Sequence, residues 1–300
     1  MPSESTIRVY TANLNSLAKD MGHPMMPEGY EWLRNHKAVF ETIKLSPSMN
    51  TWNNKLFAIK WLLDVVDAPK SILPNYEIYI AETKEAIEDA RTNKKSTKED
   101  ENWLTKKQLM GVLTDLESQI KRSIKTLNEY RNVMKYLCLK IHIETPLRND
   151  LANSKIFLDP TDEDLSNKDY NYIVLDSQNK RATFIDNVYK TKKHHGTLII
   201  HWSEEISKEL FSFYHQIVAF TTDNYFLINQ NGDQMTPNNY TKFLKGIFSS
   251  YDKNISSSMI RHIIVSELYE LDEEKEAAKK DLAYKMGHTT GIAGAIYAKL

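Results

Sequence analysis

The segment Ser258–Tyr297, SMIRHIIVSELYELDEEKEAAKKDLAYKMGHTTGIAGAIY, carries the strongest signal in this 300-residue chain. Arg261 is followed directly by His262, Gly287 precedes His288, and Tyr297 stands nine positions after His288. An arginine neutralises a phosphate, a histidine hydrogen-bonds to one of its oxygens, and a phenolic oxygen can attack phosphorus. Covalent phosphoryl transfer through tyrosine requires residues of these types.

Two upstream stretches supply the remaining groups that such chemistry needs. A second arginine and a carboxylate stand in the stretch Thr145-Pro-Leu-Arg148-Asn-Asp150. Arg148 could hold the phosphate, and Asp150 could orient the guanidinium of Arg148. Lys190-Thr-Lys192-Lys193 lies in a predicted hairpin. A lysine there, with its pKa lowered between two arginines, could donate a proton to the departing oxygen, because an alkoxide leaves poorly at neutral pH.

These motifs resemble the signature of tyrosine recombinases, the phage-type integrases. Their pattern reads Thr-Gly-Leu-Arg, a lysine-bearing hairpin, His-x-x-Arg-His, Leu-Gly-His and a tyrosine nine residues later. The resemblance implies that Arg148, Arg261 and His288 hold the scissile phosphate while Tyr297 attacks it and forms a 3′-phosphotyrosyl link. A hairpin lysine would protonate the leaving 5′ oxygen.

Lys190 fits the catalytic lysine best, while Lys193 fits if the register is counted back from the strand that follows. The other lysines of the hairpin, Lys192 and Lys193, are then expected to contact the DNA backbone.

The chain departs from the family pattern at several positions. Pro146 replaces a glycine, and Asp150 stands one residue before the place of the usual acid. Ser258 replaces a histidine, and a serine donates one hydrogen bond but holds no charge. Either His262 or a water takes over this role, or the site is slower than its relatives. His262 is otherwise expected to pack within the domain or to contact DNA.

The resemblance implies a site-specific DNA recombinase or integrase that acts on double-stranded DNA as a tetramer on paired sites, without metal, nucleotide or other cofactor. Two alternatives stay open: a type IB topoisomerase-like enzyme that relaxes DNA, and a DNA-binding relative whose catalytic site has decayed. Only Ala298-Lys-Leu300 follow Tyr297, so either a helix that passes to a neighbouring subunit is missing after it, or the chain is shortened.

The overall composition does not by itself indicate DNA. The net charge is −1 and the sequence pI is about 6.8, whereas DNA-binding domains are usually basic. Basic residues cluster, however, in 180–193 and 91–98. No apolar run is long enough for a membrane span, and the single cysteine, Cys138, excludes an internal disulfide. We therefore expect an intracellular protein that acts in prokaryotic cytoplasm, or in a eukaryotic nucleus or viral factory.

The pattern of apolar residues predicts a mainly α fold with a small antiparallel β-sheet. Residues 1–95 are expected to form a helical core-binding domain that contacts DNA, and residues 96–300 a catalytic domain like that of tyrosine recombinases. Within the catalytic domain, β-like runs near 172–201 predict a three-stranded sheet. The polar, charged stretch 92–102 predicts a linker between the domains.

Overall fold

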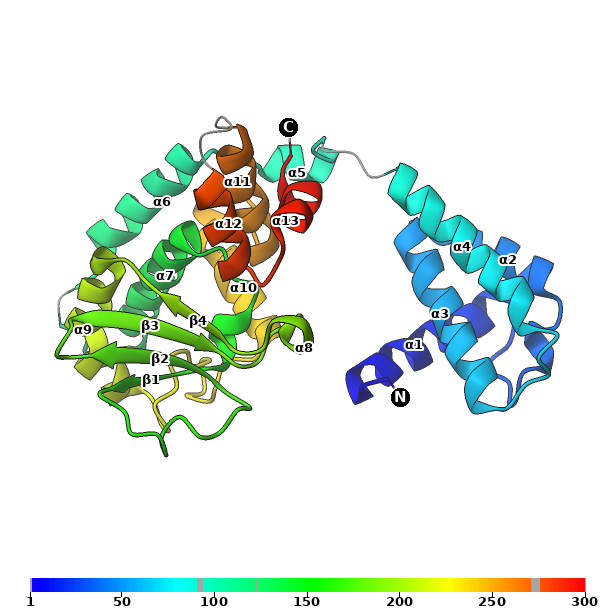
Figure 1. The fold of residues 1–300 in the computed structure, drawn as a ribbon, viewed down its shortest axis with the longest axis horizontal. Helices are drawn as coiled ribbons and strands as arrows, with labels where there is room; N and C mark the ends of the chain where they lie inside the picture. Colours follow the sequence, from blue (N-terminus) through cyan, green and yellow to red (C-terminus); the bar gives the residue numbers. More distant parts are fainter. Residues whose placement is uncertain (1, 91–93, 122, 271–275, 300) are drawn as a thin grey trace. The chain divides into compact units, whose positions relative to one another are not determined.

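The computed structural model describes residues 2–90, 94–121, 123–270 and 276–299. The chain separates into two compact units, residues 1–92 and 93–300. It is mainly helical with one small sheet, which confirms the predicted fold class (Figure 1). Within the described ranges, no helix is long and apolar enough to cross a membrane.

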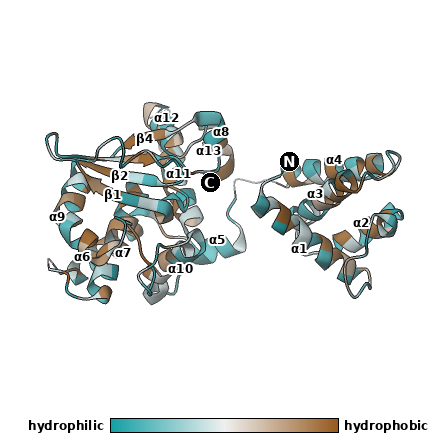
Figure 2. Ribbon diagram, turned by 90° about the horizontal axis from the view of Figure 1, so that it is seen from below, coloured by the Kyte–Doolittle hydropathy of each residue, from teal (hydrophilic) through white to brown (hydrophobic). Residues whose placement is uncertain are grey.

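The described residues 2–90 of the first unit form four α-helices, α1 (Glu4–Asp20), α2 (His36–Lys44), α3 (Met49–Val65) and α4 (Leu73–Asp89), with a 3-10 turn η1 (Glu31–Leu33) before α2. Their starts follow from side-chain caps, since Ser3 and Ser48 accept hydrogen bonds from backbone amides of α1 and α3. Hydrophobic and hydrophilic residues share each helix, and the hydrophobic faces enclose a separate core (Figure 2).

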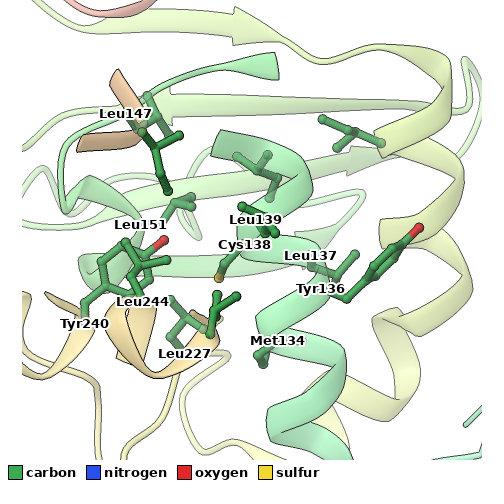
Figure 3. Close-up of a cluster of buried hydrophobic side chains, with 14 of the residues drawn as sticks. Met134, Tyr136, Leu137, Cys138, Leu139, Leu147, Leu151, Leu227, Tyr240 and Leu244 are labelled. Atoms are coloured by element: carbon green, nitrogen blue, oxygen red, sulfur yellow. The ribbon is translucent and has the colours of Figure 1, made fainter. Parts of the chain in front are cut away.

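The second unit contains most of the helices and the sheet. Its helical elements are α5 (Thr97–Asn102), α6 (Lys106–Gln119), α7 (Leu127–Glu144), η2 (Asp150–Asn153), α8 (Lys192–His195), α9 (Glu204–Phe220), α10 (Pro237–Ile247), η3 (Ser249–Tyr251), α11 (Ser257–Glu270), α12 (Glu276–Lys285) and α13 (Thr290–Tyr297). Helix α7 is central: its buried residues Met134, Tyr136, Leu137, Cys138 and Leu139 belong to the same hydrophobic core as Leu147, Leu151, Leu227, Tyr240 and Leu244 (Figure 3).

In the part of the chain that the structure describes, the sheet has four strands in the order β1 (Ser154–Leu158), β2 (Asn171–Asp176), β3 (Arg181–Asp186) and β4 (Leu198–His201). Strands β2, β3 and β4 are the three predicted antiparallel strands. Strand β1 pairs parallel to β2, so the sheet is mixed, and the prediction of a purely antiparallel three-stranded sheet was incomplete. The apolar run of β1 is too short to predict a strand, and β1 is held by pairing with β2 and by backbone hydrogen bonds to Asn224 and Phe226.

Two other elements differ from the sequence prediction. Part of the predicted linker is the helix α5, because Ser96 and Glu99 form a capping box that compensates for the lack of apolar residues. Residues 91–93 of that linker lie outside the described residues. The hairpin between β3 and β4 also contains the one-turn helix α8, which carries Lys192 and Lys193.

Candidate active site

Arg148 is positioned by the end of α7. The helix stops at Glu144 because Pro146 cannot continue it, and Thr145 already has an extended backbone. Buried Leu147 and Leu151 then anchor the chain on both sides of Arg148. The guanidinium is therefore held on a short, packed segment between α7 and η2.

Arg261 lies on the buried face of α11 and is only 3% exposed. Burial lowers the pKa of its guanidinium to about 10, while the neighbouring Tyr297 phenol opposes this shift. Its Nε has no hydrogen-bond partner among the described residues. A buried arginine with an unused donor is poorly compensated inside the protein, and it suits the binding of an anion.

His288 joins the two arginines. Its Nε2 lies 2.8 Å from Nη2 of Arg148 and 3.0 Å from Nη2 of Arg261. Because arginine only donates hydrogen bonds, Nε2 accepts both and the ring is neutral. Burial, followed by the charges of the two arginines, lowers the pKa of His288 to about 4. Two cations thus converge on one nitrogen, which is the arrangement expected where an oxyanion binds.

Tyr297 ends α13 beside this cluster and is 7% exposed. The guanidinium carbon of Arg261 lies 4.2 Å from the centre of its ring, and the His288 ring centre is 5.6 Å away. The backbone carbonyl of Tyr297 accepts hydrogen bonds from Nδ1 of His262 at 3.1 Å and from the Ser266 hydroxyl at 3.3 Å. Helix α11 thus fixes Tyr297 through its backbone and leaves the phenol for other contacts.

Lys190 lies on an exposed turn at the rim of the same region. It lines, together with Arg148 and Asp150, a cavity of about 550 Å³ between the β3–β4 connection and the start of α10. Lys193 is exposed on α8, whereas Lys192 is half-buried and its charge acts on the carboxyl of Asp186. Of the three candidate lysines, Lys190 is the one that lines this cavity with Arg148.

The two remaining sequence candidates on α11 differ in placement. Ser258 is exposed, and within the described residues its hydroxyl makes no hydrogen bond, so the structure does not join it to the cluster. His262 contacts the backbone of Tyr297 and lies 3.8 Å from Glu99, so it faces the packing between α5, α11 and α13. Ser257, which sequence reasoning missed, is buried and donates to Oδ1 of Asn149 at 2.8 Å.

Two carboxyl groups, that of buried Asp186 and that of half-buried Asp150, interact electrostatically with Arg148 of the cationic cluster. Asp186 is 1% exposed, and its Oδ1 has no hydrogen-bond partner among the described residues. Burial and then the carboxylate of Asp150 raise the pKa of Asp186, while Arg148, Lys192 and the Val188 amide oppose the shift. Burial raises the pKa of Asp150 as well, against the charges of Arg148 and Arg261. No sequence motif marked Asp186, because it ends an ordinary strand.

The carboxyl of Asp186 should make stability depend on pH. Its pKa is higher in the folded than in the unfolded chain, so the folded state binds more protons between about pH 4 and pH 8. The free energy of unfolding should therefore fall as pH rises through this window, by at most about 1.4 kcal/mol per pH unit. Asp186→Asn should flatten this dependence, as measured by urea unfolding from pH 5 to pH 8.

Asp176→Asn is the matched control, because Asp176 ends the neighbouring strand β2 and a hydrogen bond from Asn179 lowers its pKa. This substitution should leave the slope in that window unchanged. If the free energy of unfolding had the same slope against pH in Asp186→Asn and in the unaltered protein, the carboxyl of Asp186 would be ionised in the folded state.

The sequence matches no model of a protein family and no curated protein. The structure is similar to that of XerA recombinase, with 13% identity, a TM-score of 0.46, and coverage of 100% of this chain and 89% of the other. A pre-cleavage complex of XerH site-specific recombinase bound to difH substrate gives 14% identity, a TM-score of 0.47, and coverage of 100% and 93%. For the post-cleavage complex of XerH site-specific recombinase bound to palindromic difH substrate, the identity is 13% and the TM-score is 0.47, and the match covers 98% of this chain and 92% of the other.

Proposed function

We propose that this protein is a site-specific recombinase that cleaves and rejoins DNA strands through a bond between Tyr297 and the 3′ phosphate at the break. One observation carries the proposal: Arg148 and Arg261 converge on Nε2 of His288, and the Tyr297 ring packs on Arg261. Four residues that lie up to 149 positions apart in sequence thus form one cluster. In this proposal the first unit contacts DNA and the second carries the chemistry.

In the proposed step the phenolic oxygen of Tyr297 bonds to phosphorus, and the bond from phosphorus to the 5′ oxygen breaks. The phenolic proton passes to solvent, and the ammonium of Lys190 donates a proton to the departing oxygen. Arg148 and Arg261 neutralise the charge that develops on the phosphate oxygens. A 5′-hydroxyl from another strand then reverses the step. The ester conserves the bond energy, so strand exchange consumes no nucleotide.

A cavity lined by positively charged side chains, the cationic hollow, supports DNA as the partner. Arg131 and Lys135 of α7 and Lys242 of α10 line a cavity of about 430 Å³ together with Asn and Gln side chains. No carboxylate is among its described lining residues, and none of the three cations forms an ion pair with a described residue. Unpaired cations beside neutral donors suit a phosphodiester backbone. They also explain how a chain of net charge −1 could bind DNA.

Removing these three charges should reduce the salt dependence of DNA binding. Each neutralised phosphate contributes about −0.9 to the slope of log K against log salt concentration, so replacing Arg131, Lys135 and Lys242 by Gln should reduce the slope by about 2.7. Fluorescence anisotropy with a duplex at several salt concentrations measures it. Lys208→Gln removes an exposed charge on α9, outside the hollow, and serves as the control. An unchanged slope in the triple variant would exclude the hollow from the DNA interface.

The central experiment uses duplexes nicked beside each possible scissile phosphate, so that the cleaved end diffuses away and the covalent complex accumulates. Mass spectrometry after nuclease and protease digestion should locate the nucleotide on Tyr297. DNA binding without any adduct would contradict catalysis and favour a decayed DNA-binding relative.

A second assay separates recombination from relaxation. Strand exchange between two duplexes that carry the same site, accompanied by tetramers on the paired sites, is the expected result. Relaxation of supercoiled DNA without exchange would instead assign the chemistry to a topoisomerase-like enzyme.

A further inference from the structure

The turn that carries Lys190 is held at both ends. At its base, the backbone amides of Asn187 and Val188 both donate to Oδ1 of Asn171 on β2, at 2.8 Å each. At its far side, the hydroxyl of Tyr189 donates to the carbonyl of Gly196 at 2.7 Å. The backbone around Lys190 is therefore ordered by hydrogen bonds, although the lysine side chain is exposed and makes no ion pair with a described residue.

The tip of this turn contacts the segment that carries His288. The Thr191 hydroxyl donates to the carbonyl of Gly287 at 2.9 Å, across 96 positions of sequence. Gly287 has a φ of +63°, and a Cβ there would lie 2.8 Å from Cε2 of Tyr189 and 3.0 Å from Oγ1 of Thr191. Only glycine allows both this backbone conformation and this close approach. The residues on either side of Lys190 thus pack on the residue directly before His288.

We propose that Thr191 is a positioning residue that fixes Lys190 relative to the phosphate-binding cluster through its hydrogen bond to Gly287. The inference rests on the proposed function and extends it to a residue that acts through Lys190 and not on the reacting atoms. His288 bonds both arginines, and its neighbour Gly287 bonds Thr191. The proton donor and the phosphate clamp are therefore placed by one continuous set of contacts. A proton donor displaced by about 1 Å can lose much of its effect.

The test compares two leaving groups. With an ordinary phosphodiester, Thr191→Val should slow formation of the Tyr297 adduct about 10-fold to 100-fold, because general acid catalysis contributes about 10²–10⁴ and only its placement is lost. A duplex with sulfur in place of the bridging 5′ oxygen releases a thiolate, which leaves without a proton. On that substrate Thr191→Val should react within about 2-fold of the unaltered protein, as a Lys190→Ala variant should.

Two further variants exclude a general structural defect. Thr191→Ser keeps the hydroxyl and should restore the rate on the oxygen substrate. Thr197→Val makes the same change in the same connection, but that hydroxyl bonds Asn187 and not Gly287, so its rate should match the unaltered protein.

The outcomes separate this inference from the proposed function. An equal defect of Thr191→Val on both substrates, or no defect on either, would overturn the positioning role while adduct formation by the unaltered protein still stands. Absence of an adduct from the unaltered protein on both substrates would instead remove the proposed function itself.

Discussion

Replacement of Tyr297 by phenylalanine should abolish the covalent protein–DNA adduct and leave the fold and DNA binding unchanged. The substitution removes only the phenolic oxygen, which is the proposed nucleophile. The ring contact with Arg261 at 4.2 Å does not need that oxygen, and the hydrogen bonds from His262 and Ser266 go to the backbone carbonyl. Denaturing gels of nicked duplexes should show the adduct with the unaltered protein alone, while anisotropy reports equal binding.

The matched control for this variant is Tyr214→Phe. Tyr214 is a half-buried tyrosine on α9 whose hydroxyl makes no hydrogen bond with a described residue, so this variant should form the adduct at the unaltered rate. If Tyr297→Phe still forms the adduct, another nucleophile acts and the assignment of Tyr297 is wrong.

Replacement of Arg261 by methionine should separate catalysis from stability. The rate of adduct formation should fall by about 10²–10³, the usual effect of losing one preorganised donor to a developing oxyanion. The free energy of unfolding should change little or rise, because a buried guanidinium whose Nε has no hydrogen-bond partner among the described residues is replaced by an apolar chain of similar length. Single-turnover cleavage and urea unfolding measure the two quantities.

Arg181→Met makes the same substitution at an exposed arginine where β3 begins, and should alter neither quantity. Unchanged cleavage by Arg261→Met would remove Arg261 from the phosphate clamp. A loss of several kcal/mol in stability would show instead that Arg261 serves mainly to hold the fold.

Much of the helical framework could be predicted from local signals. Ser3, Ser48 and Thr236 cap α1, α3 and α10 with their side chains, and a serine or threonine directly before an apolar-periodic run is a local signal of a helix start. Strand β1 and helix α5 could not be predicted in this way. The first depends on pairing with a strand more than ten residues away, and the second on a capping box in a stretch without apolar residues.

The candidate site, like the fold, could be predicted from the sequence only in part. The order and spacing of Arg148, Arg261, His288 and Tyr297 were visible in the sequence, because residue type and chemistry are local properties. Which α11 serine turns inward was not visible, since positions three and four residues before Arg261 both lie on its side of the helix. Packing decides between them: Ser257 bonds Asn149, and Ser258 is exposed.

By itself, the sequence determined that the chain is mainly helical, and which residue types the candidate site has and in which order: two arginines, a histidine, a turn that carries lysines, and a tyrosine near the end. The tertiary structure alone decided that His288 accepts from both arginines, that Asp186 is buried beside Asp150, and that Thr191 bonds Gly287. The physical reason is distance along the chain. Contacts between residues 27 to 140 positions apart depend on how helices and sheet pack, and no local pattern encodes them.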